Sequence, residues 1–126
     1  MTKVIFRQHP ESEAIEMRVQ GHVGLDVDGK DLVCAGASTL ALTAAQNILS
    51  MRGQMQKEPT VVINSGCVRI VAKPKPEHYG AVLLVFAVIQ TGFRILADAF
   101  PDNITINTFM RPERADIKDS SPSRTD

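Results

Sequence analysis

The fold of this chain is decided by the stretch Ala14-Ile15-Glu16-Met17-Arg18-Val19-Gln20. Its large apolar residues are Ile15, Met17 and Val19, and a charged or polar residue follows each of them. Side chains two residues apart lie on the same face of a β-strand. The stretch therefore predicts a strand with one buried face and one face in water, as in a sheet whose second face is solvated.

Four further segments have the composition of strands, because they are short, rich in Val, Ile or Thr, and bounded by turn residues. They are Lys3–Gln8, Thr60–Asn64, Cys67–Ala72 and Ile104–Phe109. A turn at residues 10–13 separates the first of them from Ala14–Gln20, and the two are expected to form a hairpin that ends at Gly21-His22.

Two longer segments have the residue spacing of helices. The first begins at Asp31, whose carboxylate can cap a helix, and ends at Arg52-Gly53. Its apolar stripe is Val33, Ala37, Leu40, Ala44, Ile48 and Met51. The second covers Ala81–Phe100, with the stripe Val82, Phe86, Ile89, Phe93, Leu96 and Phe100. The order ββαββαβ predicts an α+β fold of two layers, one mostly antiparallel sheet with two helices on one face.

Length and charge limit the classes of function. The 126 residues suit a single domain, which we place at residues 1–110, and the polar segment 111–126 is expected to be a disordered tail. Fourteen basic side chains balance fourteen acidic ones, so we expect no direct binding to nucleic acid. The apolar run Ala81–Ile89 is far shorter than the roughly 20 residues that span a bilayer, so we expect no membrane segment.

Compartment and assembly follow from the cysteines and from the second helix. Two cysteines are too few for a disulfide framework, and no signal peptide is apparent, so we expect a cytoplasmic protein with free thiols. The second helix is apolar nearly all round, and Leu84, Val88 and Thr91 would lie away from the sheet. We therefore expect a homodimer that pairs through this helix.

A histidine and a cysteine stand on either side of a loop that contains glycines and acids. Cys34 falls in the first turn of the first helix, where the helix dipole and unpaired N–H groups favour the thiolate. If the loop Val23–Lys30 folds back, His22 can act as base and then as acid for this thiol. The alternatives are an inert buried thiol and an exposed imidazole, and the sequence pattern leaves both open.

Two polar neighbours of this pair also have two interpretations each. Asp31 either caps the helix or orients His22 as the third member of a Cys-His-Asp arrangement. Ser38 lies one helical turn beyond Cys34, and its hydroxyl either bonds the Cys34 carbonyl or makes a polar contact in the site.

The remaining candidate ligands predict no metal and no cofactor. A zinc site made of His22, Cys34 and Cys67 lacks the paired spacing of structural zinc ligands, so Cys67 is expected to be structural. His9 precedes a turn and His78 precedes the second helix. Neither has an evident partner, and we expect both on the surface.

The residues around the two candidate groups are similar to the signature of a known family. They are Gly21-His22 and, after a glycine-bearing loop, Asp31-Leu32-Val33-Cys34-Ala35-Gly36-Ala37-Ser38. This pattern resembles the bacterial ribosomal-processing cysteine protease family, Prp, and the order of elements over roughly Thr2 to Met110 fits it. The resemblance implies that Cys34 is the nucleophile and His22 its base and proton donor. Val23 departs from the pattern, since the family often has alanine there.

The resemblance also implies a substrate and an assembly. Members are small cytosolic homodimers that remove the N-terminal extension of bacterial large-subunit ribosomal protein number twenty-seven, as ribosome assembly requires. That extension is hydrophobic near the cut, with phenylalanines on its acyl side. Asp31 and Ser38 belong to the family pattern. We expect backbone N–H groups at Cys34 to stabilise the oxyanion, and Ala35, Gly36 and Ser38 to contact the substrate.

Two other classes of function remain open beside this cysteine endopeptidase. One is a non-enzymatic ribosome-associated assembly factor that binds RNA or protein through the polar face of the sheet, where Arg7, Arg18 and Arg69 make a modest basic patch. The other is a small thiol hydrolase acting on a metabolite ester, which would use the same two groups.

Overall fold

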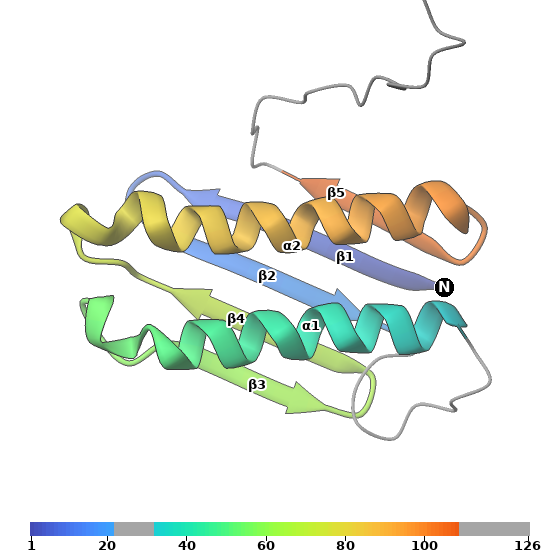
Figure 1. Ribbon diagram of the computed structural model, residues 1–126, viewed down its shortest axis with the longest axis horizontal. Coiled ribbons are helices and arrows are strands. Elements are labelled where there is room, and N and C mark those ends of the chain that lie inside the picture. Colours follow the sequence, from blue (N-terminus) through green and yellow to red (C-terminus); the bar gives the residue numbers. More distant parts are fainter. Residues whose placement is uncertain (22–31, 109–126) are drawn as a thin grey trace, which may run out of the picture.

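The structure is a computed structural model that describes residues 1–21 and 32–108. A sheet forms one layer and two long helices form the other (Figure 1). The elements are β1 (Thr2–His9), β2 (Ala14–Gln20), α1 (Leu32–Ser50), η1 (Arg52–Gln54), β3 (Thr60–Asn64), β4 (Cys67–Ala72), η2 (Pro76–His78), α2 (Tyr79–Ala99) and β5 (Ile104–Thr108). The predicted α+β class and the order ββαββαβ are confirmed, and the predicted tail 111–126 lies outside the described residues.

The sheet has the strand order β3-β4-β2-β1-β5 and is mixed. The two predicted hairpins, β1–β2 and β3–β4, are antiparallel, and so is β2–β4. β5 runs parallel to β1, with Thr2 opposite Ile104, so the expected mostly antiparallel sheet is corrected to a mixed one. The reason lies in the connection through α2. A helix that crosses back over a sheet returns the chain in the direction of the strand before it, here β4, and β4 itself points the same way as β1.

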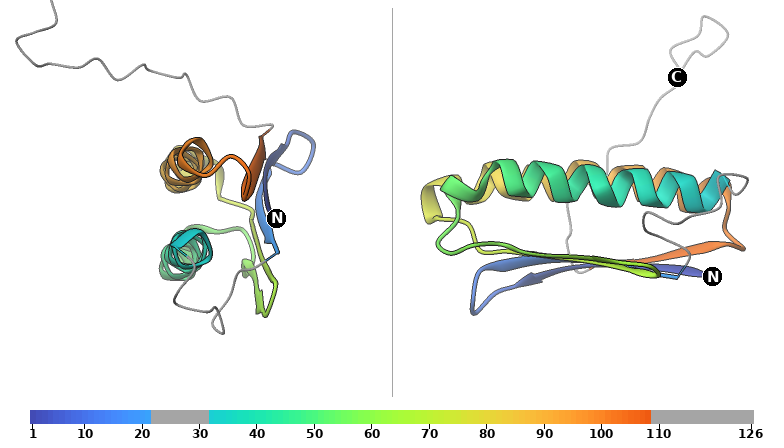
Figure 2. Two further views of the ribbon diagram at one scale, coloured as in Figure 1. Left: turned by 90° about the vertical axis from the view of Figure 1, so that its right-hand side faces the viewer. Right: turned by 90° about the horizontal axis from the view of Figure 1, so that it is seen from below.

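The core lies between the two layers, and both helices cover the same face of the sheet (Figure 2). The predicted strand alternation is confirmed, because Ile15, Met17 and Val19 are fully buried. Most of each predicted helical stripe is buried too: Val33, Ala37, Ala44 and Ile48 in α1, and Val82, Phe86, Ile89 and Phe93 in α2. The stripes reach the sheet directly, as the edge-on contact of Phe6 and Phe93 shows, with ring centroids 6.1 Å apart.

Both helices also meet a length and hydropathy criterion for membrane spans. Core helices of soluble proteins meet the same criterion. Here α1 contacts β4, and α2 contacts β5 and β2.

The two helices approach each other closely where each has a glycine. A Cβ atom at Gly92 would lie 2.6 Å from Leu40 Cδ2, and one at Gly36 would lie 3.2 Å from Leu96 Cδ1. Leu40 of α1 therefore packs against Gly92 of α2, and Leu96 of α2 packs against Gly36 of α1. Larger residues at these positions would push the helices apart or displace the leucine.

Replacing Gly92 by alanine is expected to lower the free energy of unfolding by about 1 kcal/mol, because the overpacking exceeds the gain in helix propensity. The matched change Gly80→Ala, in the first turn of the same helix, places its Cβ in open space. It should raise the free energy of unfolding by about 0.5 kcal/mol. Urea denaturation of the two variants checks this, and an equal effect of both would contradict the close approach.

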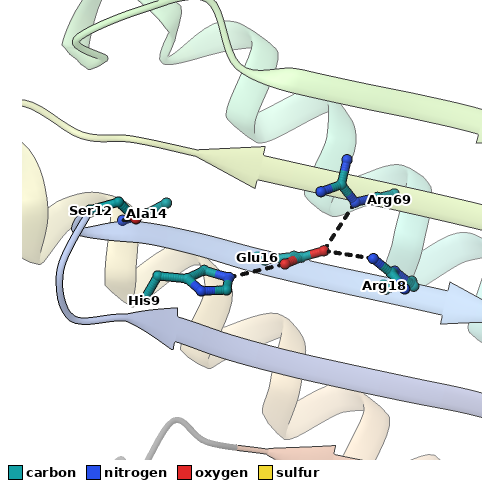
Figure 3. A network of polar contacts seen from close by, with 6 residues as sticks. All are labelled: His9, Ser12, Ala14, Glu16, Arg18 and Arg69. Atoms are coloured by element: carbon teal, nitrogen blue, oxygen red, sulfur yellow. Dashed lines mark hydrogen bonds and ion pairs between the residues drawn. The ribbon is translucent and has the colours of Figure 1, made fainter.

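The face of the sheet that points away from the helices is organised around Glu16, whose side chain is only 9% exposed. Its Oε2 accepts hydrogen bonds from Arg69 Nε at 3.0 Å and Arg18 Nη2 at 3.2 Å, and its Oε1 is 3.0 Å from His9 Nε2 (Figure 3). Our expectation that His9 has no partner is therefore wrong, because pairing of β1 with β2 brings its imidazole beside the carboxylate.

Burial raises the pKa of Glu16, but the hydrogen bonds from His9 and Arg69 and the charges of Arg69 and Arg18 outweigh it, so the net pKa is lowered. A lowered folded-state pKa gives stability that is present above the unfolded-state pKa of about 4.3 and is lost as the pH falls through the folded-state value.

Glu16→Gln is therefore expected to cost about 2 kcal/mol of unfolding free energy at pH 7, and less as the pH falls below about 4. Denaturant titrations at pH 7 and pH 3 measure the difference. Glu11→Gln is the control, since Glu11 is exposed in the β1–β2 turn. A cost of Glu16→Gln that is equal at both pH values would show that the ionised carboxylate is not what stabilises this face.

Candidate active site

The candidate nucleophile lies at the end of the molecule where several chain segments meet. The end of β2, the start of α1, the β3–β4 turn and the start of β1 all lie there (Figure 1). Cys34 is the third residue of α1 and is 5% exposed. The prediction that it belongs to the first turn of a helix is confirmed. It is thus a buried thiol beside backbone N–H groups that have no acceptor within the helix.

Gly21 fixes the point where the chain leaves β2 toward His22. Its φ is +126°, and a Cβ atom there would lie 2.8 Å from the Met1 carbonyl oxygen and 2.9 Å from Thr2 Cα. Its N–H donates to the Gly66 carbonyl at 3.0 Å. The backbone is therefore held between the N-terminus and the β3–β4 turn, in a conformation and a space that favour glycine.

His22, Asp31 and the loop Val23–Lys30 lie outside the described residues. The meeting of His22 with Cys34 and the two interpretations of Asp31 therefore stay predictions. The end of β2 and the start of α1, which this segment joins, lie at the same end of the molecule (Figure 1).

The predicted substrate-contacting residues separate onto two sides of α1. Ser38 is buried one turn beyond Cys34, on the side of the helix that packs with Ala37 and Ala41. Ala35 and Gly36 are half-buried and line a groove on the other side. Ala35 and Gly36 thus face an open surface, and the two interpretations of the Ser38 hydroxyl stay predictions.

This groove lies between the start of α1 and the end of α2 and has a volume of about 600 Å³. It is almost entirely apolar, and its lining is Leu32, Ala35, Gly36, Thr39, Leu40, Gly92, Ile95, Leu96, Ala99 and Phe100. The contribution of α2 was not predicted from the sequence. The one sequence feature that could have indicated it is Ile95, an apolar residue that lies outside the core stripe of α2. In the structure this side chain is 62% exposed.

The described residues form neither a disulfide nor a cluster of metal-ligating side chains. Neither Cys34, which is buried, nor Cys67, which is half-buried, forms a disulfide. Within residues 1–21 and 32–108, no three His, Cys, Asp or Glu side chains are grouped so that they could hold a metal ion. The zinc arrangement that includes His22 falls partly outside this range.

Comparison with known proteins finds a family whose model matches this chain. The family model described as cysteine protease Prp matches residues 1–105, which include β1, β2, both helices, Cys34 and the segment up to it. Among curated proteins, none matches the chain.

Solved structures share the fold. An essential ribosomal processing protease Prp from S. aureus in complex with a substrate peptide is 18% identical, with a TM-score of 0.62 over 86% of this chain and 99% of that chain. The same protease with a covalently linked product peptide gives the same values. The protein SMU.848 from Streptococcus mutans is 22% identical, with a TM-score of 0.61 over 86% of this chain and 93% of that chain.

Proposed function

Because this chain belongs to the cysteine protease Prp family, we propose that it is an endopeptidase that trims a ribosomal-protein precursor, with Cys34 as nucleophile and His22 as base. The observation that carries this is the position of Cys34, a buried thiol in the first turn of α1 inside the matched residues. The S. aureus structure of similar fold, a ribosomal processing protease holding a substrate peptide, supports a ribosomal protein as the substrate class.

The reaction is acyl transfer through a thioester. His22 takes the proton of Cys34 Sγ, which attacks the scissile carbonyl carbon, and N–H groups of the first turn of α1 hold the developing oxyanion. The C–N bond breaks as His22 returns the proton to the leaving amine. Water, deprotonated by the same imidazole, then hydrolyses the thioester and restores the thiol. No metal or cofactor takes part in these steps.

We propose the hydrophobic N-terminal extension of large-subunit ribosomal protein number twenty-seven as the substrate. The apolar groove between α1 and α2 suits hydrophobic side chains such as phenylalanine, and Ala35 and Gly36 in its wall lie next to Cys34 in sequence. To reach both the groove and the thiol, the peptide would pass over the start of α1. Leu32, which lines the groove there, is 72% exposed.

The test is incubation of the full chain with a synthetic peptide that covers the extension and the first mature residues, followed by mass measurement. We expect two fragments whose masses sum to that of the peptide plus one water. A peptide with serines in place of its phenylalanines is the control and should be cut more slowly. A precursor peptide that stays intact would contradict the proposed substrate.

We further propose that the protein is a homodimer that pairs through α2. Leu84, Val88 and Ile95 of α2 are 63%, 60% and 62% exposed, and Ile95 also lines the rim of the groove. Several large apolar side chains exposed on one helix favour a protein interface. Its two cysteines, which form no disulfide, fit a reducing cytoplasm, which we propose as its compartment.

Sedimentation is expected to give about twice the 13.8 kDa chain mass, and Val88→Glu should reduce it to the chain mass, because a buried unpaired carboxylate opposes association. Thr60→Glu adds the same charge on the exposed side of β3, in the other layer, and should leave the dimer intact. A wild-type protein that sediments as a monomer at micromolar concentration would exclude this assembly.

A further inference from the structure

The outer face of the sheet, opposite the helices, carries more basic than acidic side chains among the described strand residues, although the chain as a whole is neutral. Strand alternation places Lys3 and Arg7 of β1 on this face, since Val4 and Phe6 between and beside them are buried against the helices. Arg18 and Arg69 lie on it too, directly opposite each other in the β2–β4 pairing. We call this set of four cations the basic sheet face.

One acid opposes these cations among the described strand residues of this face, and it is Glu16. Other acids near the sheet lie in turns, such as Glu11 and Glu13 between β1 and β2. With Lys3, Arg18 and Arg69 against the one carboxylate of Glu16, the described strand residues of this face have a surplus of positive charge. The whole chain has equal numbers of basic and acidic side chains, and from this we expected no direct binding to nucleic acid. On this surface the two kinds of charge are not equal in number.

Glu16 holds two of the cations in place. Like charges directly opposite each other in a sheet are destabilising. Arg18 and Arg69 nevertheless face each other, because both donate to the same carboxylate oxygen of Glu16 (Figure 3). Each uses one nitrogen for this bond, so each guanidinium keeps further N–H donors, and the two side chains are 38% and 41% exposed. The result is a pair of fixed, solvent-facing guanidiniums.

We propose that the basic sheet face binds the phosphate backbone of RNA, as a second surface separate from the Cys34 site. Guanidiniums with free donors bind phosphate oxygens in a bidentate manner. Nucleic-acid interfaces are polar and positively charged at their centre, whereas the cores of protein interfaces are depleted of charge. Here the charged group Arg18–Glu16–Arg69 occupies the central strands β2 and β4, which favours RNA over an acidic protein.

The size of the face sets the expected strength. Arg69, Arg18 and Lys3 lie on the three neighbouring strands β4, β2 and β1, which are about 5 Å apart, so these three cations can reach about three phosphates. No aromatic side chain of the described strands points to this face, so the bases are not stacked and the binding should be independent of sequence. The logarithm of affinity should fall with the logarithm of salt concentration with a slope of about −2.

The test is fluorescence anisotropy of the full chain, in its Cys34→Ala form, with a labelled 12-nucleotide single-stranded RNA of mixed sequence at 50 and 200 mM KCl. Lys3→Gln should weaken binding about threefold or more at 50 mM, and Arg69→Gln at least as much. Lys57→Gln, which removes an exposed cation outside the strands, should change affinity by less than twofold. Because Arg69 also supports Glu16, Lys3→Gln is the variant that tests the surface without changing the Glu16 bonds.

Three results would overturn this inference. They are no binding at 50 mM KCl, an equal loss for Lys57→Gln and Lys3→Gln, and tighter binding of a poly-glutamate peptide of the same charge as the RNA. The last would assign the surface to an acidic protein. None of them bears on peptide cleavage, because the RNA measurements use a variant without the nucleophile.

Discussion

Replacing Cys34 by alanine is expected to abolish cleavage of the precursor peptide, with a loss of at least about 10³-fold in rate, while the protein stays folded. A nucleophile and its base act as a unit, so removal of the attacking atom leaves only binding and oxyanion stabilisation. Alanine suits the first turn of a helix, and the loss of one buried sulfur should cost about 1 kcal/mol of stability. Peptide cleavage followed by mass spectrometry, together with thermal unfolding, measures both effects.

The second cysteine of the chain provides a matched control. Cys67 begins β4 on the outer face of the sheet, paired with Gln20, and it is half-buried. Cys67→Ala should therefore cleave at nearly the wild-type rate. If Cys34→Ala cleaved as fast as the wild type, or if Cys67→Ala abolished cleavage, the assignment of the nucleophile would be wrong.

Replacing Gly21 by alanine is expected to have the largest effect on stability, a loss of about 3 kcal/mol. The new Cβ would lie within 2.9 Å of two backbone atoms of Met1 and Thr2, which cannot rotate away, and φ is +126°. Since Gly21 directly precedes His22, we also expect kcat/KM to fall further than the loss of folded protein explains. Urea denaturation and cleavage assays at a temperature where the variant remains folded separate the two effects.

Gly53→Ala is the matched control, because nothing lies within 4 Å of a Cβ atom at that position. It should change neither cleavage nor stability by more than about 0.5 kcal/mol. A Gly21→Ala variant as stable as Gly53→Ala would show that the N-terminus does not hold this turn. One that loses stability but cleaves at the full rate when folded would show that the turn does not position His22.

The strands could be predicted almost to the residue because their local signals agree. Ala14–Gln20, Thr60–Asn64 and Cys67–Ala72 were all predicted with the bounds that the structure has. Alternation gives such strands their buried face, and Pro and Gly residues mark their ends. The predicted helix ends differ from the structure: α2 begins at Tyr79, before the predicted Ala81, because the 3₁₀ turn that begins at Pro76 leads into it and Gly80 does not interrupt it.

What the sequence could not predict depends on how separate elements are placed. The parallel pairing of β5, the groove between the ends of the helices and the partner of His9 each join residues that are distant in the chain or that meet only through strand register. The position of Cys34 was predictable because a helix start is a local signal. Its pairing with His22 depends on a loop outside the described residues, and it stays a prediction that rests on the family.

The pairing of the first strand with the last has a consequence for how the chain folds during synthesis. β1 is an interior strand, and its β5 side is completed only when Ile104–Thr108 is available. A nascent chain can form the β1–β2 hairpin and dock both helices, but β1 keeps an open hydrogen-bonding edge until nearly the whole domain has been translated. At about 5–20 residues per second this edge stays exposed for several seconds. Completion of the sheet is thus a late, non-local step, and we expect it to limit the folding rate.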